Sequence, residues 1–145
     1  MATDPTQSLT LRQRGCFDFF TTDSLRIADL DQNAHVNNIS FLELFENVRN
    51  RFIMERTPLV RDDARTYMLV HLDIDFVSEL HYPGTPEAAC RILEVRRSSL
   101  VFGQAIFVGE RVAATGHAAI VHVDRITRKS LPFDDDIRAA LNSLG

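Results

Sequence analysis

The chain has 145 residues and a formal net charge of -4, and 45% of its residues are hydrophobic, which is ordinary for one soluble globular domain. The acidic balance argues against non-specific nucleic-acid binding, which requires a basic face. No apolar run is long enough to span a bilayer, and the N-terminus lacks the apolar segment of a secretory signal. The sequence therefore predicts a cytoplasmic protein with no membrane association.

The predicted elements start with an N-terminal stretch, residues 1–15, that is polar and aperiodic and is expected to form a loose tail. Residues 16–30 are rich in aromatic, threonine and aliphatic side chains, which favours a strand. Residues 39–54 contain neither Gly nor Pro and predict a long buried helix that Asn37 or Asn38 caps. Its apolar side chains at helical spacing are Ile39, Leu42, Phe45, Phe52 and Ile53.

The rest of the chain is dominated by strand patterns. Residues 67–80 alternate, and the apolar face predicted for them consists of Met68, Val70, Leu72, Ile74 and Phe76. Short turns separate three more predicted strands, at 88–96, 100–108 and 111–124, which favours an antiparallel meander. Acidic residues lead into a short helix near 134–144.

The order of these elements predicts an α+β fold in which an antiparallel sheet wraps around one apolar helix. Residues 16–145 are expected to form this single domain. Cys16 and Cys90 lie far apart without metal-ligand spacing, so neither a disulfide framework nor a metal site is predicted. Cys90 falls in the middle of a predicted strand and is expected in the core.

The loop DLDQNAHVNN, residues 29–38, concentrates polar groups between the first predicted strand and the helix. Asp31 is the candidate acid or base, because a neighbouring apolar helix would partly desolvate its carboxylate and raise its basicity. Asn33 and His35 are spaced to face the same cavity, where they would fix a water or a substrate carbonyl. This combination predicts a catalytic site on the loop.

The start of the helix supplies the second part of that chemistry. The backbone N–H groups around Asn37, Asn38 and Ile39 lack intrahelical partners and would polarise a carbonyl oxygen during attack. A carboxylate, a water and a helix N-terminus are the minimum set for acyl hydrolysis. Asp and Asn residues in such loops also act as turn formers and helix caps, and this alternative suits the asparagines better than the acid–imidazole pair.

The motif DLDQNAHVNN and the aromatic-rich helix after it resemble the signature of hotdog-fold acyl thioesterases, both the plant acyl-ACP enzymes and the bacterial 4-hydroxybenzoyl-CoA thioesterase-like enzymes. The resemblance covers about residues 16–132 and implies a five- to six-stranded antiparallel sheet around one long helix. It implies an acyl-CoA thioesterase with Asp31 as general base or nucleophile, accompanied by Asn33 and His35. Asn38 matches the helix-start position whose N–H polarises the thioester carbonyl. No cofactor is implied, because coenzyme A is part of the substrate.

The resemblance also implies an assembly with shared sites. Single hotdog domains form homodimers, often paired into tetramers, and residues 71–76 are expected to line the partner's site. Candidate substrate-binding residues are Asn37, His71, Ser98 and Ser99. A basic group is a candidate for holding the coenzyme phosphates: Arg91, Arg96, Arg97, Arg125, Arg128 and Lys129.

Two alternatives stay open from the residues. The hotdog enoyl-CoA hydratases carry a related motif, but their His follows the Asp by five residues with an intervening Pro, whereas His35 follows Asp31 by four without one. A non-catalytic acyl-CoA-binding module is the other alternative, although the first 15 residues leave no room for a helix-turn-helix. The strand histidines show no metal-ligand spacing, so no metal is assigned.

Overall fold

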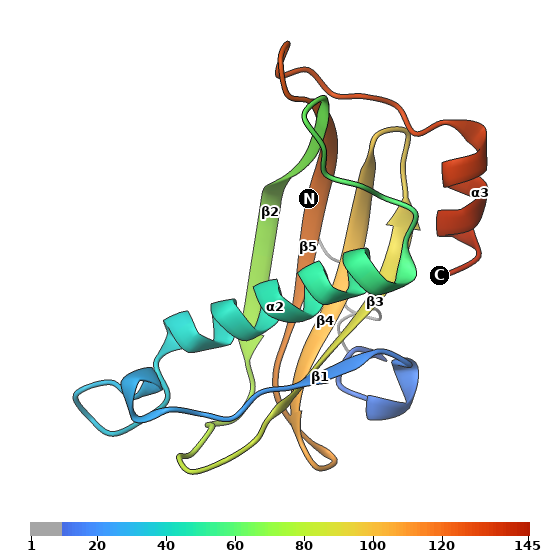
Figure 1. The fold of residues 1–145 in the computed structure, drawn as a ribbon. Helices are drawn as coiled ribbons and strands as arrows, with labels where there is room; N and C mark the ends of the chain where they lie inside the picture. The colour runs from blue at the N-terminus through green and yellow to red at the C-terminus, as the bar shows by residue number, and fades with distance from the viewer. Residues whose placement is uncertain (1–9) are drawn as a thin grey trace.

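A computed structural model describes residues 10–145, and Figure 1 shows a long helix lying across one face of an antiparallel sheet. The five strands are β1 (Phe20–Thr22), β2 (Arg65–Phe76), β3 (Glu87–Val95), β4 (Ser99–Val108) and β5 (Arg111–Asp124). Their order in the sheet is β1-β3-β4-β5-β2, so β1 and β2 are the edges. The helices are α2 (Asn38–Arg56), α3 (Asp135–Asn142) and two 3-10 turns, η1 (Arg14–Cys16) and η2 (Ile27–Asp29).

These bounds confirm the α+β prediction of a sheet wrapped around one helix, with β3, β4 and β5 forming the predicted meander. Helix α3 covers the end of the sheet near β3 (Figure 1). Within residues 10–145, no helix is long and apolar enough to cross a membrane.

Helix α2 turns one apolar face to the sheet and leaves other apolar residues outside. Its buried apolar residues are Phe41, Leu44, Phe45, Val48, Phe52 and Ile53. Ile39 is 61% exposed and Leu42 is 40% exposed. The prediction that both belong to the buried stripe is wrong, because the apolar set of this helix is wider than the face that the sheet covers.

Strand β2 carries a bulge that divides its side-chain pattern. Its pairing with β5 shifts register between Leu69 and His71. Leu72 and Ile74, beyond the bulge, pack against the core as predicted, whereas Val70 is 61% exposed. The single apolar face predicted for this strand is therefore wrong before the bulge, because one extra residue reverses which side chains point inward.

The first predicted strand is much shorter than residues 16–30. Only Phe20–Thr22 pairs with β3. After it, the N–H of Leu25 donates to the carbonyl oxygen of Gly84 at 2.8 Å, and the chain then turns into η2. A strand over the whole segment is wrong, because the later backbone groups bond to the turn before β3 and within η2 instead of to a strand.

Within residues 10–15, which the sequence assigns to a loose tail, one side chain is anchored in the fold and most of the others are exposed. Leu11 is 1% exposed and joins a second apolar cluster with Phe17 and Phe107. This cluster lies on the sheet face opposite α2, because Leu11 packs against Gly103, and Gly103 alternates along β4 with residues of the main core. The rest of the predicted tail, residues 1–9, lies outside the described residues.

Gly116 of β5 lies beneath a buried ring of α2. A Cβ at this position would lie 3.2 Å from Cε2 of Phe45 and 2.4 Å from the carbonyl oxygen of Asp73. The ring of Phe45, which is fully buried, thus occupies the space that a side chain would fill. A side chain at position 116 would therefore press on the Phe45 ring and on the backbone of β2.

Candidate active site

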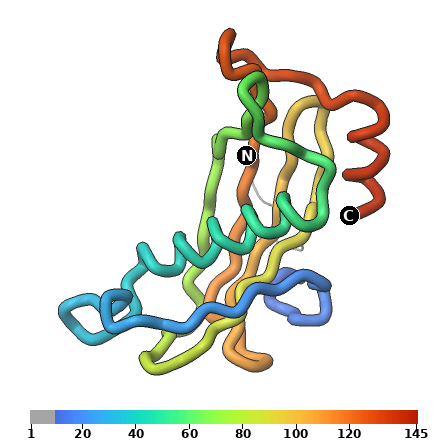
Figure 2. Tube along the Cα trace, viewed as in Figure 1, coloured from blue at the N-terminus to red at the C-terminus, as the bar shows by residue number. Residues whose placement is uncertain are grey.

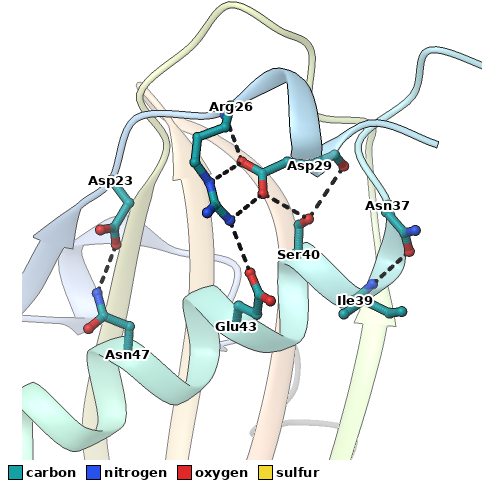
Figure 3. Close-up of polar contacts among 8 residues, drawn as sticks. All are labelled: Asp23, Arg26, Asp29, Asn37, Ile39, Ser40, Glu43 and Asn47. Atoms are coloured by element: carbon teal, nitrogen blue, oxygen red, sulfur yellow. Dashed lines mark hydrogen bonds and ion pairs between the residues drawn. The ribbon is translucent and has the colours of Figure 1, made fainter.

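The segment before the helix is anchored by a buried carboxylate, Asp29 (Figure 3). Its Oδ1 accepts a hydrogen bond from Nη2 of Arg26 at 2.8 Å, and its Oδ2 accepts from the Arg26 N–H at 2.7 Å. The hydroxyl of Ser40 on α2 donates to the same carboxylate at 3.4 Å. Burial alone would raise the pKa of Asp29, but the hydrogen bonds and charge of Arg26 lower it overall. This ionised anchor fixes the loop to the first turn of the helix.

Asp31 holds the following turn through one carboxylate oxygen. Its Oδ1 accepts the backbone N–H groups of Asn33 at 2.8 Å and of His35 at 3.1 Å. The N–H of Asp31 donates to the carbonyl oxygen of His35 at 2.8 Å, and a bridge between Leu30 and Val36 closes the loop. Oδ2 accepts no hydrogen bond from residues 10–145, so it is available to a water or a substrate.

The helix start offers one free backbone donor. The N–H of Asn37 donates to the carbonyl oxygen of Asp29 at 2.7 Å, and the N–H of Ile39 donates to Oδ1 of Asn37 at 3.0 Å. The N–H of Asn38 makes no hydrogen bond to any residue that the structure describes. Of the three donors expected at this helix start, only that of Asn38 is available, and Asn37 acts as the N-cap.

Asp31 and the helix start open on one cavity of about 320 Å³. In Figure 2 the loop before α2 and the turn between β2 and β3 lie at the same end of the molecule. Both segments contribute to the wall, which consists of Asp31, His35, Val36, Asn38, Phe41, Phe76, Val77, Ser78, Glu79 and Leu80. The wall therefore combines apolar side chains with a few polar groups, as is typical of small-molecule sites.

His35 faces a carboxylate that the sequence did not single out. Its Nδ1 lies 3.8 Å from Oε1 of Glu79, which lines the same cavity. Glu79 follows β2 in an irregular segment, and the two residues meet only when this segment folds against the loop. Because His35 and Glu79 are far apart in the sequence, no local pattern could predict that they pair.

Other predicted site residues do not line this cavity. Asn33 is exposed and contributes its N–H to the turn. His71 lies in the middle of β2. Ser98 and Ser99 lie at the turn from β3 to β4, at the opposite end of the sheet from the turn between β2 and β3 (Figure 1).

Two of the basic residues expected to hold phosphates already contact other groups of the chain. Nη1 of Arg91 donates to the carbonyl oxygen of Cys16 at 3.1 Å, and Arg96 pairs with Glu94. Arg125 and Arg128 line a separate cavity beside the start of β2. Cys90 is fully buried, as predicted. Among residues 10–145, no group of three His, Cys, Asp or Glu side chains is placed to hold a metal ion.

The sequence of residues 25–141 matches the thioesterase-like superfamily. The chain belongs to this superfamily. No curated protein matches the chain in sequence. The match confirms the resemblance to thioesterases that the motif in residues 29–38 indicated.

Solved structures share the fold of this thioesterase-like chain. The PA5185 protein from Pseudomonas aeruginosa strain PAO1 is 27% identical, with a TM-score of 0.81 over 91% of this chain and 94% of that one. A predicted thioesterase from Bacillus stearothermophilus is 23% identical, with a TM-score of 0.78 over 87% and 95%. The SAV2348 protein from Staphylococcus aureus, solved in complex with CoA, is 18% identical, with a TM-score of 0.78 over 86% and 82%. The hotdog arrangement is therefore common to all of them.

Proposed function

We propose that this chain is an acyl-CoA thioesterase that hydrolyses its substrate in the cavity between Asp31 and the start of α2. The observation that carries the proposal is that a carboxylate oxygen of Asp31 and the N–H of Asn38, neither bonded within residues 10–145, belong to residues lining one cavity. Superfamily membership supports the reaction class, and the CoA complex of the Staphylococcus aureus protein supports coenzyme A as the thiol.

In the proposed reaction, water attacks the thioester carbonyl carbon while Asp31 accepts a proton from it. The carbonyl oxygen becomes negatively charged and is stabilised by the N–H of Asn38 and the positive end of the helix dipole. The tetrahedral intermediate then expels the coenzyme A thiolate, which takes up a proton, and the free acid leaves. The same carboxylate can instead attack the carbon directly and form an anhydride that water hydrolyses. Neither route requires a cofactor.

Substitution of Asp31 by Asn tests the proposal, because an amide oxygen can still accept the two N–H bonds of the turn. We expect Asp31→Asn to fold normally and to lose on the order of 10²-fold or more in kcat/KM. Release of free thiol across a panel of acyl-CoA substrates is the measurement, and it also identifies the acyl class.

The matched control is Asp63→Asn, an exposed site outside the cavity, which should keep full activity. Asp31→Ala removes both the base and the turn bonds, so it should also lower the melting temperature. Near-normal hydrolysis by Asp31→Asn would defeat the proposed role of Asp31. Hydration of an enoyl-CoA without thiol release would replace the thioesterase by a hydratase.

We also propose that the enzyme is at least a homodimer that associates through β2. This strand is an edge of the sheet, and such edges pair readily with another chain. Exposed apolar residues gather on it: Met68, Leu69, Val70 and Phe76. If two copies of β2 pair around a two-fold axis, the two strands run antiparallel. The end of one β2, which borders the Asp31 cavity, then lies towards the start of the other β2. That start borders the separate cavity lined by Arg125 and Arg128. The second subunit would thus supply charges for the coenzyme phosphates.

A further inference from the structure

An ion pair with a buried carboxylate ties the segment before α2 to the helix, on a flank of α2 away from the proposed reaction. A separate cavity of about 330 Å³ has Arg26, Asp29, Ser40 and Glu43 in its wall. No residue of this wall lines the Asp31 cavity, and none belongs to β2. The contacts among these side chains (Figure 3) therefore lie outside both the substrate cavity and the proposed dimer interface.

The carboxylate of Asp29 is the centre of these contacts, and the residue is only 6% exposed. Arg26 holds both carboxylate oxygens, through its backbone N–H at 2.7 Å and its Nη2 at 2.8 Å. The same Nη2 lies 3.5 Å from Oε2 of Glu43 on α2. The charge of Arg26 thus joins a carboxylate of η2 to a carboxylate of the helix. Because loss of one partner would leave a buried charge unpaired, this ion pair opposes movement of the segment.

The backbone of Asp29 decides which N–H at the helix start is left free. Its carbonyl oxygen accepts the N–H of Asn37 at 2.7 Å, and the hydroxyl of Ser40 lies 3.4 Å from the same oxygen. The next N–H along the chain is that of Asn38, which lines the proposed site. A shift of Asp29 would release the N–H of Asn37 and turn the first residues of the helix. The direction of the Asn38 N–H therefore depends on where Asp29 is held.

We infer that Asp29 and Arg26 are positioning residues for the Asn38 N–H, which rests on the proposed function. They hold the helix start in the orientation at which this N–H meets the oxyanion, without touching the substrate. Donors of this kind act within about 0.5 Å of their productive position, and a displacement of about 1 Å can lower turnover by about 10²-fold. An ion pair outside the cavity thus contributes to the rate inside it.

Steady-state hydrolysis of acyl-CoA by Asp29→Ala and Arg26→Gln tests these roles. Each variant should lower kcat by about 10-fold or more with little change in KM, because the N–H bonds the oxyanion more strongly than the ground-state carbonyl. The Arg26 side chain is 67% exposed, so Arg26→Gln should fold even if Asp29→Ala does not. An unchanged kcat in Arg26→Gln would overturn the inference.

The matched control is Asn47→Ala. Nδ2 of Asn47 donates to Oδ2 of Asp23 at 3.0 Å and ties the same segment to the same helix, farther from the helix start. This variant should keep the wild-type kcat. A loss equal to that of Arg26→Gln would reduce both effects to general loosening of the segment and would also overturn the inference.

The substitution Asn38→Pro, which removes the N–H, shows whether Arg26 acts through it. In the Asn38→Pro background, Arg26→Gln should lower kcat no further, because the two changes affect one interaction. A second loss of the same size in this background would contradict the assigned role.

Hydrogen exchange of single amides, followed by NMR, reports the geometry without any substrate. The N–H of Asn37 should exchange at least about 10-fold faster in Arg26→Gln than in the wild type, because its acceptor is no longer held in place. Equally slow exchange in both proteins would contradict the inference. If the wild type hydrolyses no acyl-CoA, the thioesterase proposal fails, whereas the exchange of Asn37 still decides whether Arg26 holds the helix start.

Discussion

At the scale of single residues, the proposed reaction uses the side chain of one residue in the motif and the backbone of another. Asp31 gives one carboxylate oxygen to the turn and leaves the other available, and Asn38 contributes its N–H. The motif was sufficient to predict that Asp31 and the helix start face one cavity, and the catalytic role of Asp31 stays a prediction. Which N–H stays free was not predictable, because it depends on where the cap of Asn37 and the carbonyl of Asp29 lie in the folded loop.

Substitution of Asn38 by Pro tests the backbone donor directly. Asn38 is the first residue of α2 and the N-cap before it is extended, with φ -64° and ψ 142°, a position and geometry that suit Pro. The helix should therefore form normally, while loss of one oxyanion donor lowers kcat by about 10²- to 10³-fold. Thiol-release kinetics and circular dichroism provide the two measurements.

Asn38→Ala is the control for this substitution, since it keeps the N–H and removes only the side chain. It should retain most of the activity. Equal losses in the Ala and Pro variants would move the role from the backbone to the amide side chain.

At the scale of elements, a ring stack ties β2 and β5 to the segment before α3. His122 lies between the rings of Tyr67 and Phe133, at centroid distances of 5.6 Å and 5.5 Å, and its Nδ1 donates to the carbonyl oxygen of Leu131 at 3.1 Å. Burial lowers the pKa of His122, an effect that the bond to Leu131 opposes. The neutral ring is therefore the form that the fold favours.

This stack predicts a loss of stability in mild acid. Because the pKa of His122 is lower in the folded than in the unfolded state, unfolding takes up a proton as the pH falls below about 6.5. The stabilisation is complete above that pH and is lost as the pH falls through the lowered folded value. Urea unfolding at pH 7.5 and 5.5 should show a smaller acid loss for His122→Phe than for the wild type. His81→Phe, at an exposed site, should lose stability like the wild type, and equal losses in all three proteins would exclude His122 as the cause.

The elements that could be predicted from the sequence are those with a long, uninterrupted helix or strand pattern. Helix α2 and strands β3 to β5 lie within one or two residues of their predicted bounds, because short polar turns separate the strands and the helix segment contains neither Gly nor Pro. Strand β1 was overestimated, since only three of its residues meet a partner strand. No residue in β2 signals the bulge in the sequence. A strictly alternating pattern therefore assigned Val70 to the wrong face of the strand.

At the scale of the whole molecule, the open edge of β2 is the feature through which the proposed assembly would affect the proposed activity. A lysine on an edge strand opposes pairing with another chain because its charge would have to be buried. Val70→Lys should therefore shift the proposed dimer to a monomer in sedimentation velocity and lower hydrolysis with it. Val108→Lys, at an exposed position on β4, should leave both unchanged. A dimeric and fully active Val70→Lys protein would exclude β2 as the interface.

The close approach of Gly116 and Phe45 links the position of α2 above the sheet to the absence of a side chain on β5. An added methyl group at Gly116 would press against the carbonyl of Asp73 and against the Phe45 ring, so β2, the ring or α2 would have to shift. A shift of α2 would carry with it the N–H of Asn38 at the start of the helix. If the proposed mechanism holds, the position of the oxyanion donor would thus depend on the absence of a side chain at Gly116, which lies on the sheet beneath the helix.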